Sequence, residues 1–197
     1  VTAYERYAKV FRHVNSKVAV QKLEELRKVK PDYPVEATAA EIMLGDGKYK
    51  EALEWYAKAN PANMSEDNFY NYGFAAYITK DYQRALDVVK QGLQKFPNSE
   101  YLSRIAMMAS VELKDYASAI NYGKVVFAGS GKKVANDYDV CAKALCGAQQ
   151  YDEAINTVNK ALELDKNNIE PLKTLAAIYA AQGNDDKALE EIGRAHV

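Results

Sequence analysis

Few residues of this 197-residue chain have the types and spacing that catalysis requires. The two histidines, His13 and His196, each stand alone, whereas acid–base and metal chemistry need histidine close to other polar or ligating groups. No HExxH, CxxC or EF-hand pattern occurs. We therefore expect no catalytic residue, no cofactor and no metal site, and a protein that is not an enzyme.

The segment Ala128–Lys133, AGSGKK, comes nearest to a phosphate-binding loop. That motif needs a glycine five residues before Gly131 and a serine or threonine after its lysine. Val126 and Lys133 occupy those two positions, and the flanking sequence is helical, with no strand before the glycines. We expect a flexible connection between helices here.

Composition narrows the remaining function classes. Hydrophobic residues make up 48% of the chain and charged residues 27%, which is ordinary for a folded globular protein. The formal net charge of -1 gives a nucleic acid little electrostatic attraction. No apolar run approaches the roughly 20 residues of a membrane-spanning helix. Cys141 and Cys146 share one predicted helix, about 8 Å apart by helix geometry, which is too far for a relaxed disulfide.

An internal repeat organises the whole sequence. Alanine recurs in one column at steps of 33, 33, 34, 35 and 34 residues: Ala19, Ala52, Ala85, Ala119, Ala154 and Ala188. Three residues before each alanine stand Ser16, Tyr49, Tyr82, Tyr116, Tyr151 and Asp185. A period in this range is the signature of a stacked repeat array.

Each repeat reads as two helices. In the second repeat, a first helix is predicted from Pro34 to about Leu44, and a second from about Lys48 to Asn60, where Pro61 ends it. Glu54 and Lys58 are spaced for an ion pair. The second helix has an apolar stripe at helical spacing, formed by Tyr49, Ala52, Leu53, Tyr56 and Ala59.

The alanine column has a physical reason. Two helices joined by a short turn approach closely only where the facing side chains are small. The first helices supply small residues at the matching position in four repeats, namely Ala40, Gly73, Ala142 and Ala176. Tyr7 and Met107 stand there in the first and fourth repeats, so we expect looser packing in those two pairs.

The spacing and residues resemble the tetratricopeptide repeat, a helix–turn–helix unit of 34 residues. The resemblance covers about six units, at roughly 1–32, 33–65, 66–99, 100–134, 135–168 and 169–190. The turn glycine of the pattern, present at Gly47, is replaced by Lys80, Lys114 and Gln149. The residues assigned to repeat packing are Tyr49, Ala52, Ala59, Gly73, Tyr82, Ala85, Ala119, Ala154 and Ala188.

The resemblance implies an all-α, right-handed superhelical solenoid with a concave face lined by the first helices. It also implies a scaffold that binds a protein or peptide on that face; the alternative is a structural spacer or assembly segment of a longer multidomain protein. The expected partner-binding residues are Tyr70, Asn71, Phe74, Tyr77, Tyr101, Arg104, Met108 and Lys143. Further positions expected on this face are Ala8, Ala37, Thr38, Glu41, Asp139 and Thr174.

Both ends of the sequence raise separate expectations. The final residues, Glu191–Val197, resemble a translated sequencing adapter, and the alternative is a native helix end. We expect Leu175, Ile178 or Leu189 to be exposed towards an absent neighbouring repeat, with self-association as the consequence. The style of the repeats resembles bacterial proteins, some of which are exported to the periplasm.

Overall fold

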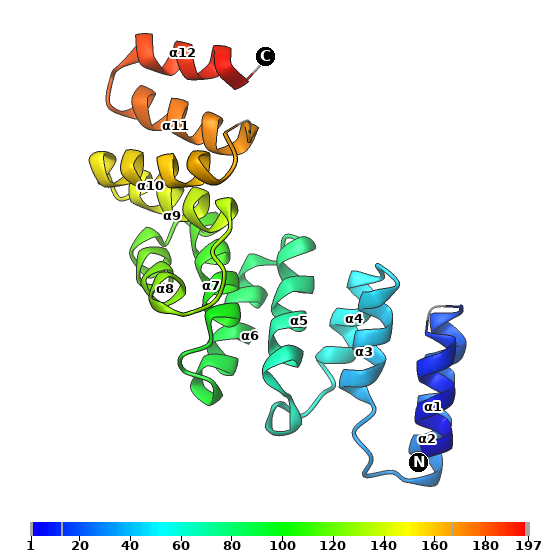
Figure 1. Ribbon diagram of the computed structural model, residues 1–197. Coiled ribbons are helices and arrows are strands. Elements are labelled where there is room, and N and C mark those ends of the chain that lie inside the picture. The colour runs from blue at the N-terminus through cyan, green and yellow to red at the C-terminus, as the bar shows by residue number, and fades with distance from the viewer. Residues whose placement is uncertain (1, 13, 167, 196–197) are drawn as a thin grey trace. The chain divides into compact units, whose positions relative to one another are not determined.

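Figure 1 shows the computed structural model, which describes residues 2–12, 14–166 and 168–195. Over these residues there are twelve α-helices, one short 3₁₀ helix (η1) and no strand. In chain order the elements are α1 (Thr2–Phe11), α2 (Ser16–Val29), α3 (Glu36–Gly45), α4 (Tyr49–Tyr56), η1 (Pro61–Asn63), α5 (Glu66–Ile78), α6 (Tyr82–Lys95), α7 (Glu100–Glu112), α8 (Tyr116–Ala128), α9 (Ala135–Gly147), α10 (Tyr151–Leu164), α11 (Ile169–Ala181) and α12 (Asp185–Ala195).

The helices pack as consecutive pairs, from α1 with α2 to α11 with α12. The chain divides into two compact units, Val1–Phe96 with α1 to α6 and Pro97–Val197 with α7 to α12. In the first unit α2 packs on α3, and both α3 and α4 pack on α5. In the second, α7 and α8 pack on α9, and α9 and α10 pack on α11. The predicted all-α array of stacked helix pairs is confirmed within each unit.

The alanine column forms the contact inside each pair. Ala19, Ala52, Ala85, Ala119 and Ala154 are 0% exposed, and Ala188 is 5% exposed. The small residues predicted to face them, Ala40, Gly73, Ala142 and Ala176, are also buried. Because neither helix presents a long side chain at this point, the two backbones approach closely.

Five of the turns within pairs are closed by a residue in the left-handed region. The φ angles of these residues lie between 61° and 76°: Gly47, Lys80, Lys114, Gln149 and Gly183. The following N–H donates to the carbonyl five residues earlier, as Asp81 does to Ala76 over 2.9 Å, which is the hydrogen bond of a Schellman motif. At Lys80, Lys114 and Gln149 the backbone therefore adopts the left-handed conformation that favours glycine, although none of these residues is glycine.

The first pair departs from the predicted register. Ala8, expected on the partner-binding face, is 1% exposed and packs with Ala19 in the core, whereas Tyr7 is 36% exposed. The facing alanine thus lies eleven residues before the column alanine, instead of twelve. The α1–α2 connection also differs, because the Asn15 N–H bonds to the Phe11 carbonyl and the Asn15 side chain caps α2.

The fourth pair is not loosely packed. Met107 is 0% exposed, and α8 places Gly123 beside it. A Cβ atom at Gly123 would lie only 3.3 Å from the Met107 sulfur and 3.4 Å from the Cys141 sulfur. A large residue on one helix is therefore matched by the absence of a side chain on the other.

α4 is shorter than predicted. It ends at Tyr56 rather than near Asn60, because the last turn tightens and Asn60 caps the 3₁₀ helix that begins at Pro61. Ala59, assigned to the apolar stripe of this helix, lies beyond its end and is half-buried. Lys58 does not pair with Glu54; its ammonium lies 4.7 Å from the centre of the Trp55 ring.

The glycine-rich loop between α8 and α9 is held by a hydrogen bond and an ion pair to α7, so the expectation of a flexible connection is wrong. The Glu100 carboxylate on α7 accepts the Gly131 N–H at 3.0 Å and lies 2.8 Å from the Lys133 ammonium. The hydrogen bond from Lys133 lowers the pKa of this carboxyl. A Cβ atom at Gly129 would lie 1.9 Å from a Glu100 oxygen, so the glycine admits a carboxylate of the same chain rather than a phosphate.

The terminal pair corrects one expectation. Leu175 and Ile178 are 3% and 0% exposed, so neither faces solvent, while Leu189 is 67% exposed as anticipated. Glu191–Ala195 continue α12, and Arg194 pairs with Glu191 at 2.6 Å.

Replacing the three left-handed residues by glycine should stabilise the fold. A left-handed conformation costs an L-residue roughly 1–2 kcal/mol, part of which the greater flexibility of glycine in the unfolded chain removes. Lys80→Gly, Lys114→Gly and Gln149→Gly should each raise the free energy of unfolding by about 0.5–1 kcal/mol, measured by urea denaturation. Lys124→Gly, within α8, is the control and should lower it by a similar amount; equal losses at all four positions would contradict this explanation.

Enlarging a column alanine should have the opposite effect. Ala85 is 0% exposed, so Ala85→Leu should lower the free energy of unfolding by about 1–3 kcal/mol through overpacking. The exposed Ala117 in the first turn of α8 is the comparison: Ala117→Leu should be close to neutral. If Ala85→Leu were tolerated equally well, close approach of the helices would not be the reason for the column.

Candidate functional site

The aromatic side of α5 is the most distinctive surface of the first unit. Asn68, Asn71, Phe74 and Tyr77 follow each other at steps of three residues, which places them along one inclined row of the helix. The Tyr70 and Phe74 rings stack with centroids 6.1 Å apart, and Tyr77 packs against Tyr82 of α6 at 5.4 Å. All four predicted contact residues of α5, Tyr70, Asn71, Phe74 and Tyr77, are half-buried.

A capping box fixes the start of α5. The Ser65 hydroxyl accepts the Asn68 N–H at 3.2 Å, and the Asn68 side-chain oxygen accepts the Ser65 N–H at 3.0 Å. The Asn68 amide also donates to the Glu41 carboxylate of α3 over 2.6 Å. One side chain therefore both begins α5 and joins it to α3. We call the surface formed by Thr38, Glu41, Tyr70, Asn71, Phe74 and Tyr77 the α3–α5 face.

The pKa values of two groups at this face, the Glu41 carboxyl and the buried Tyr56 hydroxyl, are raised. Desolvation raises the pKa of the Glu41 carboxyl, although the hydrogen bond from Asn68 opposes that shift. Tyr56 is 1% exposed, and burial, reinforced by the Glu41 charge, raises the pKa of its hydroxyl. Thr38 is half-buried and Glu41 is exposed at the edge of the face. The sequence predicts both residues on this face, whereas Asn68 was not predicted, although the Ser65-x-x-Asn68 capping pattern signals it.

A polar cavity of about 240 Å³ opens beside the α3–α5 face, between the start of α3, η1 and the start of α5. No lysine, arginine or histidine is among the described residues that line it. Its polar lining includes Glu36, Thr38, Glu41, Asn60, Asn63 and Asn68. We call it the Glu41 cavity.

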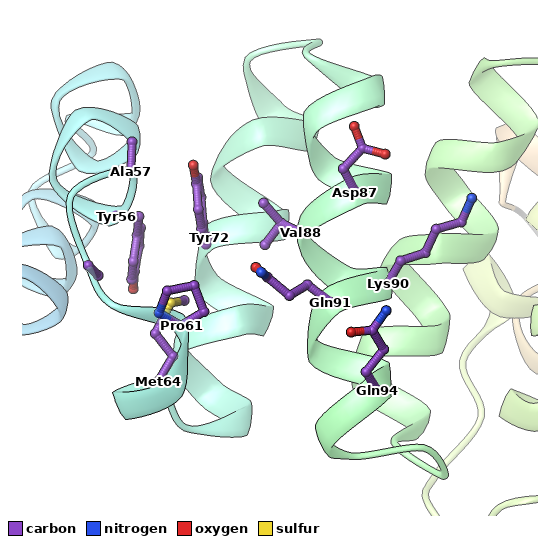
Figure 2. Close-up of a pocket in the computed structure, with 11 residues that line it drawn as sticks. Tyr56, Ala57, Pro61, Met64, Tyr72, Asp87, Val88, Lys90, Gln91 and Gln94 are labelled. Carbon is purple, nitrogen blue, oxygen red and sulfur yellow. The ribbon is translucent and has the colours of Figure 1, made fainter.

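A larger and more open cavity, of about 450 Å³, lies between α4 and α6 (Figure 2). Ala57, Ala59 and Pro61, which follow the end of α4 at Tyr56, are among its lining residues. Figure 2 shows the Tyr56 and Tyr72 rings standing parallel on one side, with centroids 5.1 Å apart. Residues of α6 line the other side: Asp87, Val88, Lys90, Gln91 and Gln94.

In the second unit, the predicted contact residues are largely engaged within the chain. Arg104 forms a two-point ion pair with Asp137, at 2.6 and 3.1 Å, and Asp137 is 0% exposed. Lys143 pairs with Asp139 at 2.7 Å. Asp139 and Thr174, expected on the binding face, are 1% and 5% exposed and belong to the interior. Met108 packs against the core. Of the four predicted contact residues in this unit, which are Tyr101, Arg104, Met108 and Lys143, only Tyr101 is well exposed, at 59%.

The described residues form no group of three or more histidine, cysteine, aspartate or glutamate side chains able to hold a metal ion. His13 and His196 lie outside the described residues. Burial raises the pKa of the Cys141 thiol to about 11 and also raises that of Cys146, which makes both poor nucleophiles. Over the same residues, no helix has the length and apolar character needed to cross a membrane.

Comparison with known proteins gives consistent matches. Residues 145–195 match the family model of the tetratricopeptide repeat. A TPR repeat-containing protein of Methanocaldococcus jannaschii is 24% identical over 157 residues, which cover 78% of this chain and 27% of that protein. Tetratricopeptide repeat protein 14 of Mus musculus is 49% identical over 42 residues, 21% of this chain and 6% of that protein. The chain thus spans only a minor part of both relatives.

Solved structures share the fold. A tetratricopeptide repeat protein from Parabacteroides merdae superposes with a TM-score of 0.78 at 16% identity, over 99% of this chain and 78% of that one. MamA from Desulfovibrio magneticus RS-1 superposes with a TM-score of 0.72 at 23% identity, over 82% of this chain and 92% of that one. At these identities the likeness concerns the fold alone.

The Arg104–Asp137 pair yields a prediction about stability. Asp137 also accepts the Val134 N–H at 3.0 Å and so holds the start of α9. Arg104→Ala should lower the free energy of unfolding by about 3–5 kcal/mol, because it leaves a buried carboxylate without its cation. Lys173→Ala removes the exposed Lys173–Glu170 pair and should cost at most about 1 kcal/mol. If Arg104→Ala left the stability unchanged in thermal and urea denaturation, the ion pair would not be a structural requirement. The binding role predicted for Arg104 from the sequence would then remain open.

Proposed function

Because this chain is a tetratricopeptide-repeat protein, we propose that it is a non-enzymatic scaffold that binds a peptide or partner protein on the α3–α5 face. The observation that supports the proposal is the row of half-buried aromatic side chains on α5, flanked by asparagines. Tyrosine and phenylalanine are favoured at binding interfaces. Rings already held by stacking also lose little conformational freedom when a partner binds.

The second unit supplies a separate, smaller contact surface in this proposal. Tyr101 is its exposed aromatic residue, and the half-buried Met108 and Lys143 are proposed as secondary contacts. Arg104 takes a structural role instead of an anchoring one, since Asp137 and the Lys132 carbonyl occupy its guanidinium. The proposed partner is a protein or peptide and not a nucleic acid, consistent with the near-neutral charge.

A spacer or assembly segment of a longer protein is the second candidate function. It is favoured by the small share of the Methanocaldococcus jannaschii and Mus musculus relatives that the matching segments cover. A spacer depends on the stability of the array and not on the side chains of one face. The two functions therefore respond differently to Phe74→Ala, which alters the α3–α5 face, and to Ala85→Leu, which disrupts packing.

Removing one aromatic anchor tests the proposal. Against peptides selected from a random display library on the full chain, Phe74→Ala should weaken binding by about 2 kcal/mol, or roughly thirtyfold, as loss of a central aromatic contact does. Leu164→Ala removes an exposed apolar side chain from α10 and is the matched control, with no expected effect. Affinities are measured by calorimetry.

Two results would count against the scaffold proposal. Selected peptides whose affinity is unchanged by Phe74→Ala, Tyr70→Ala and Tyr77→Ala would place the binding surface elsewhere. The two variants can also be compared in the organism that carries this protein. If Phe74→Ala left the protein's function there unchanged while the destabilising Ala85→Leu abolished it, the spacer function would be favoured.

A further inference from the structure

The Glu41 cavity is rich in acceptors, and no lysine, arginine or histidine is among the described residues around it. Carboxylates of Glu36 and Glu41 line it together with the side chains of Thr38, Asn60, Asn63 and Asn68. Carboxylates accept hydrogen bonds without donating any, and amides and hydroxyls both accept and donate. The lining therefore suits a ligand group that carries several N–H donors and a positive charge.

Of the two carboxylates, Glu36 already has a partner, because Arg27 of α2 donates to it. Glu41 has no ion pair among the described residues, and the hydrogen bond to it comes from the neutral amide of Asn68. A carboxylate offers about four acceptor positions, so most of the capacity of Glu41 is unused. Desolvation also raises the pKa of this carboxyl, and the hydrogen bond from Asn68 only partly opposes that shift.

Besides Arg27, which is bound to Glu36, two cations of the chain act in this region, Arg12 and Lys95. Arg12 acts on the Glu41 carboxyl electrostatically and lowers its pKa, although desolvation raises that pKa by more. The Lys95 ammonium donates to the Ala62 and Met64 carbonyls, at 2.9 and 2.8 Å, and so holds η1 in place. Lys95 thus supports η1 and is not among the described residues that line the cavity.

The cavity is continuous with the aromatic row. Asn68 lines the cavity and begins the row that continues through Asn71 to Phe74. The Glu41 charge also raises the pKa of the buried Tyr56 hydroxyl behind the face. A ligand lying along α5 over Phe74 therefore passes the mouth of the cavity.

We propose that the Glu41 cavity receives a basic side chain, arginine or lysine, of a peptide bound along the α3–α5 face. This inference rests on the proposed function and names the chemistry of its partner: a basic residue followed by apolar or aromatic ones. Charge-assisted hydrogen bonds to Glu41 are the strong contacts. A phosphorylated or acidic side chain would instead meet the Glu41 carboxylate, with no cation among the described residues that line the cavity.

The test uses the full chain and a random peptide display library, followed by calorimetry on the selected sequences. Peptides selected on the natural sequence should share one position enriched in arginine or lysine. Glu41→Gln keeps the shape of the side chain and removes its charge, and should weaken their binding about tenfold. Glu54→Gln, at an exposed position of α4 outside the cavity, should leave affinity unchanged.

A double-mutant cycle separates the pocket from general electrostatics. Replacing the basic residue of the peptide by norleucine should cost about tenfold on the natural chain and little on Glu41→Gln. An equal loss on both chains would overturn the inference, and so would selected peptides without a basic position whose binding still depends on Phe74. In those two cases the scaffold function stands. Selected peptides whose affinity is unchanged by Phe74→Ala would contradict the scaffold proposal itself, and with it this inference.

Discussion

Close approach of two helices at an alanine is the constraint on which the rest of the structure depends. The column from Ala19 to Ala188 is buried throughout and is faced by a small residue in five pairs, while in the fourth pair Gly123 makes room for Met107. Helices that approach this closely need a tight connection. The left-handed turn provides it even where lysine or glutamine must adopt a glycine conformation. The strain in those turns is therefore a consequence of packing elsewhere in the pair.

The same constraint determines where binding chemistry can reside. The sides of the first helices that face the column are small and buried, so variable side chains are confined to the remaining faces. On α5 those faces carry Tyr70, Phe74 and Tyr77, and on α3 they carry Glu41. The short α4 and the 3₁₀ helix after it interrupt the regular plan between these two helices. The Glu41 cavity forms at this irregularity, which makes the second pair chemically distinct within an otherwise repetitive first unit.

The period and the small residues at the helix contacts were predictable from the sequence, because packing repeats and leaves a pattern at fixed spacing. The early end of α4 was not, since Lys58 and Ala59 have ordinary helix propensities and the stop comes from the cap at Asn60. The Ala8 register in the first pair and the ion pair of Arg104 with Asp137 also escaped prediction. They depend on contacts between residues distant in sequence, and a single chain gives no periodic signal for such contacts. The candidate site was predicted by helix and by face, but not by its cavity.

Amide hydrogen exchange of the full chain, with and without a selected peptide, tests the central claim most directly. The α3–α5 account predicts slowed exchange in Glu36–Gly45 and Glu66–Ile78, where the peptide covers and rigidifies the first helices. Exchange in Tyr82–Lys95, which lines the cavity of Figure 2, should change little. Protection concentrated in Tyr82–Lys95, with none in Glu66–Ile78, would contradict the account and place the binding surface on the second helices.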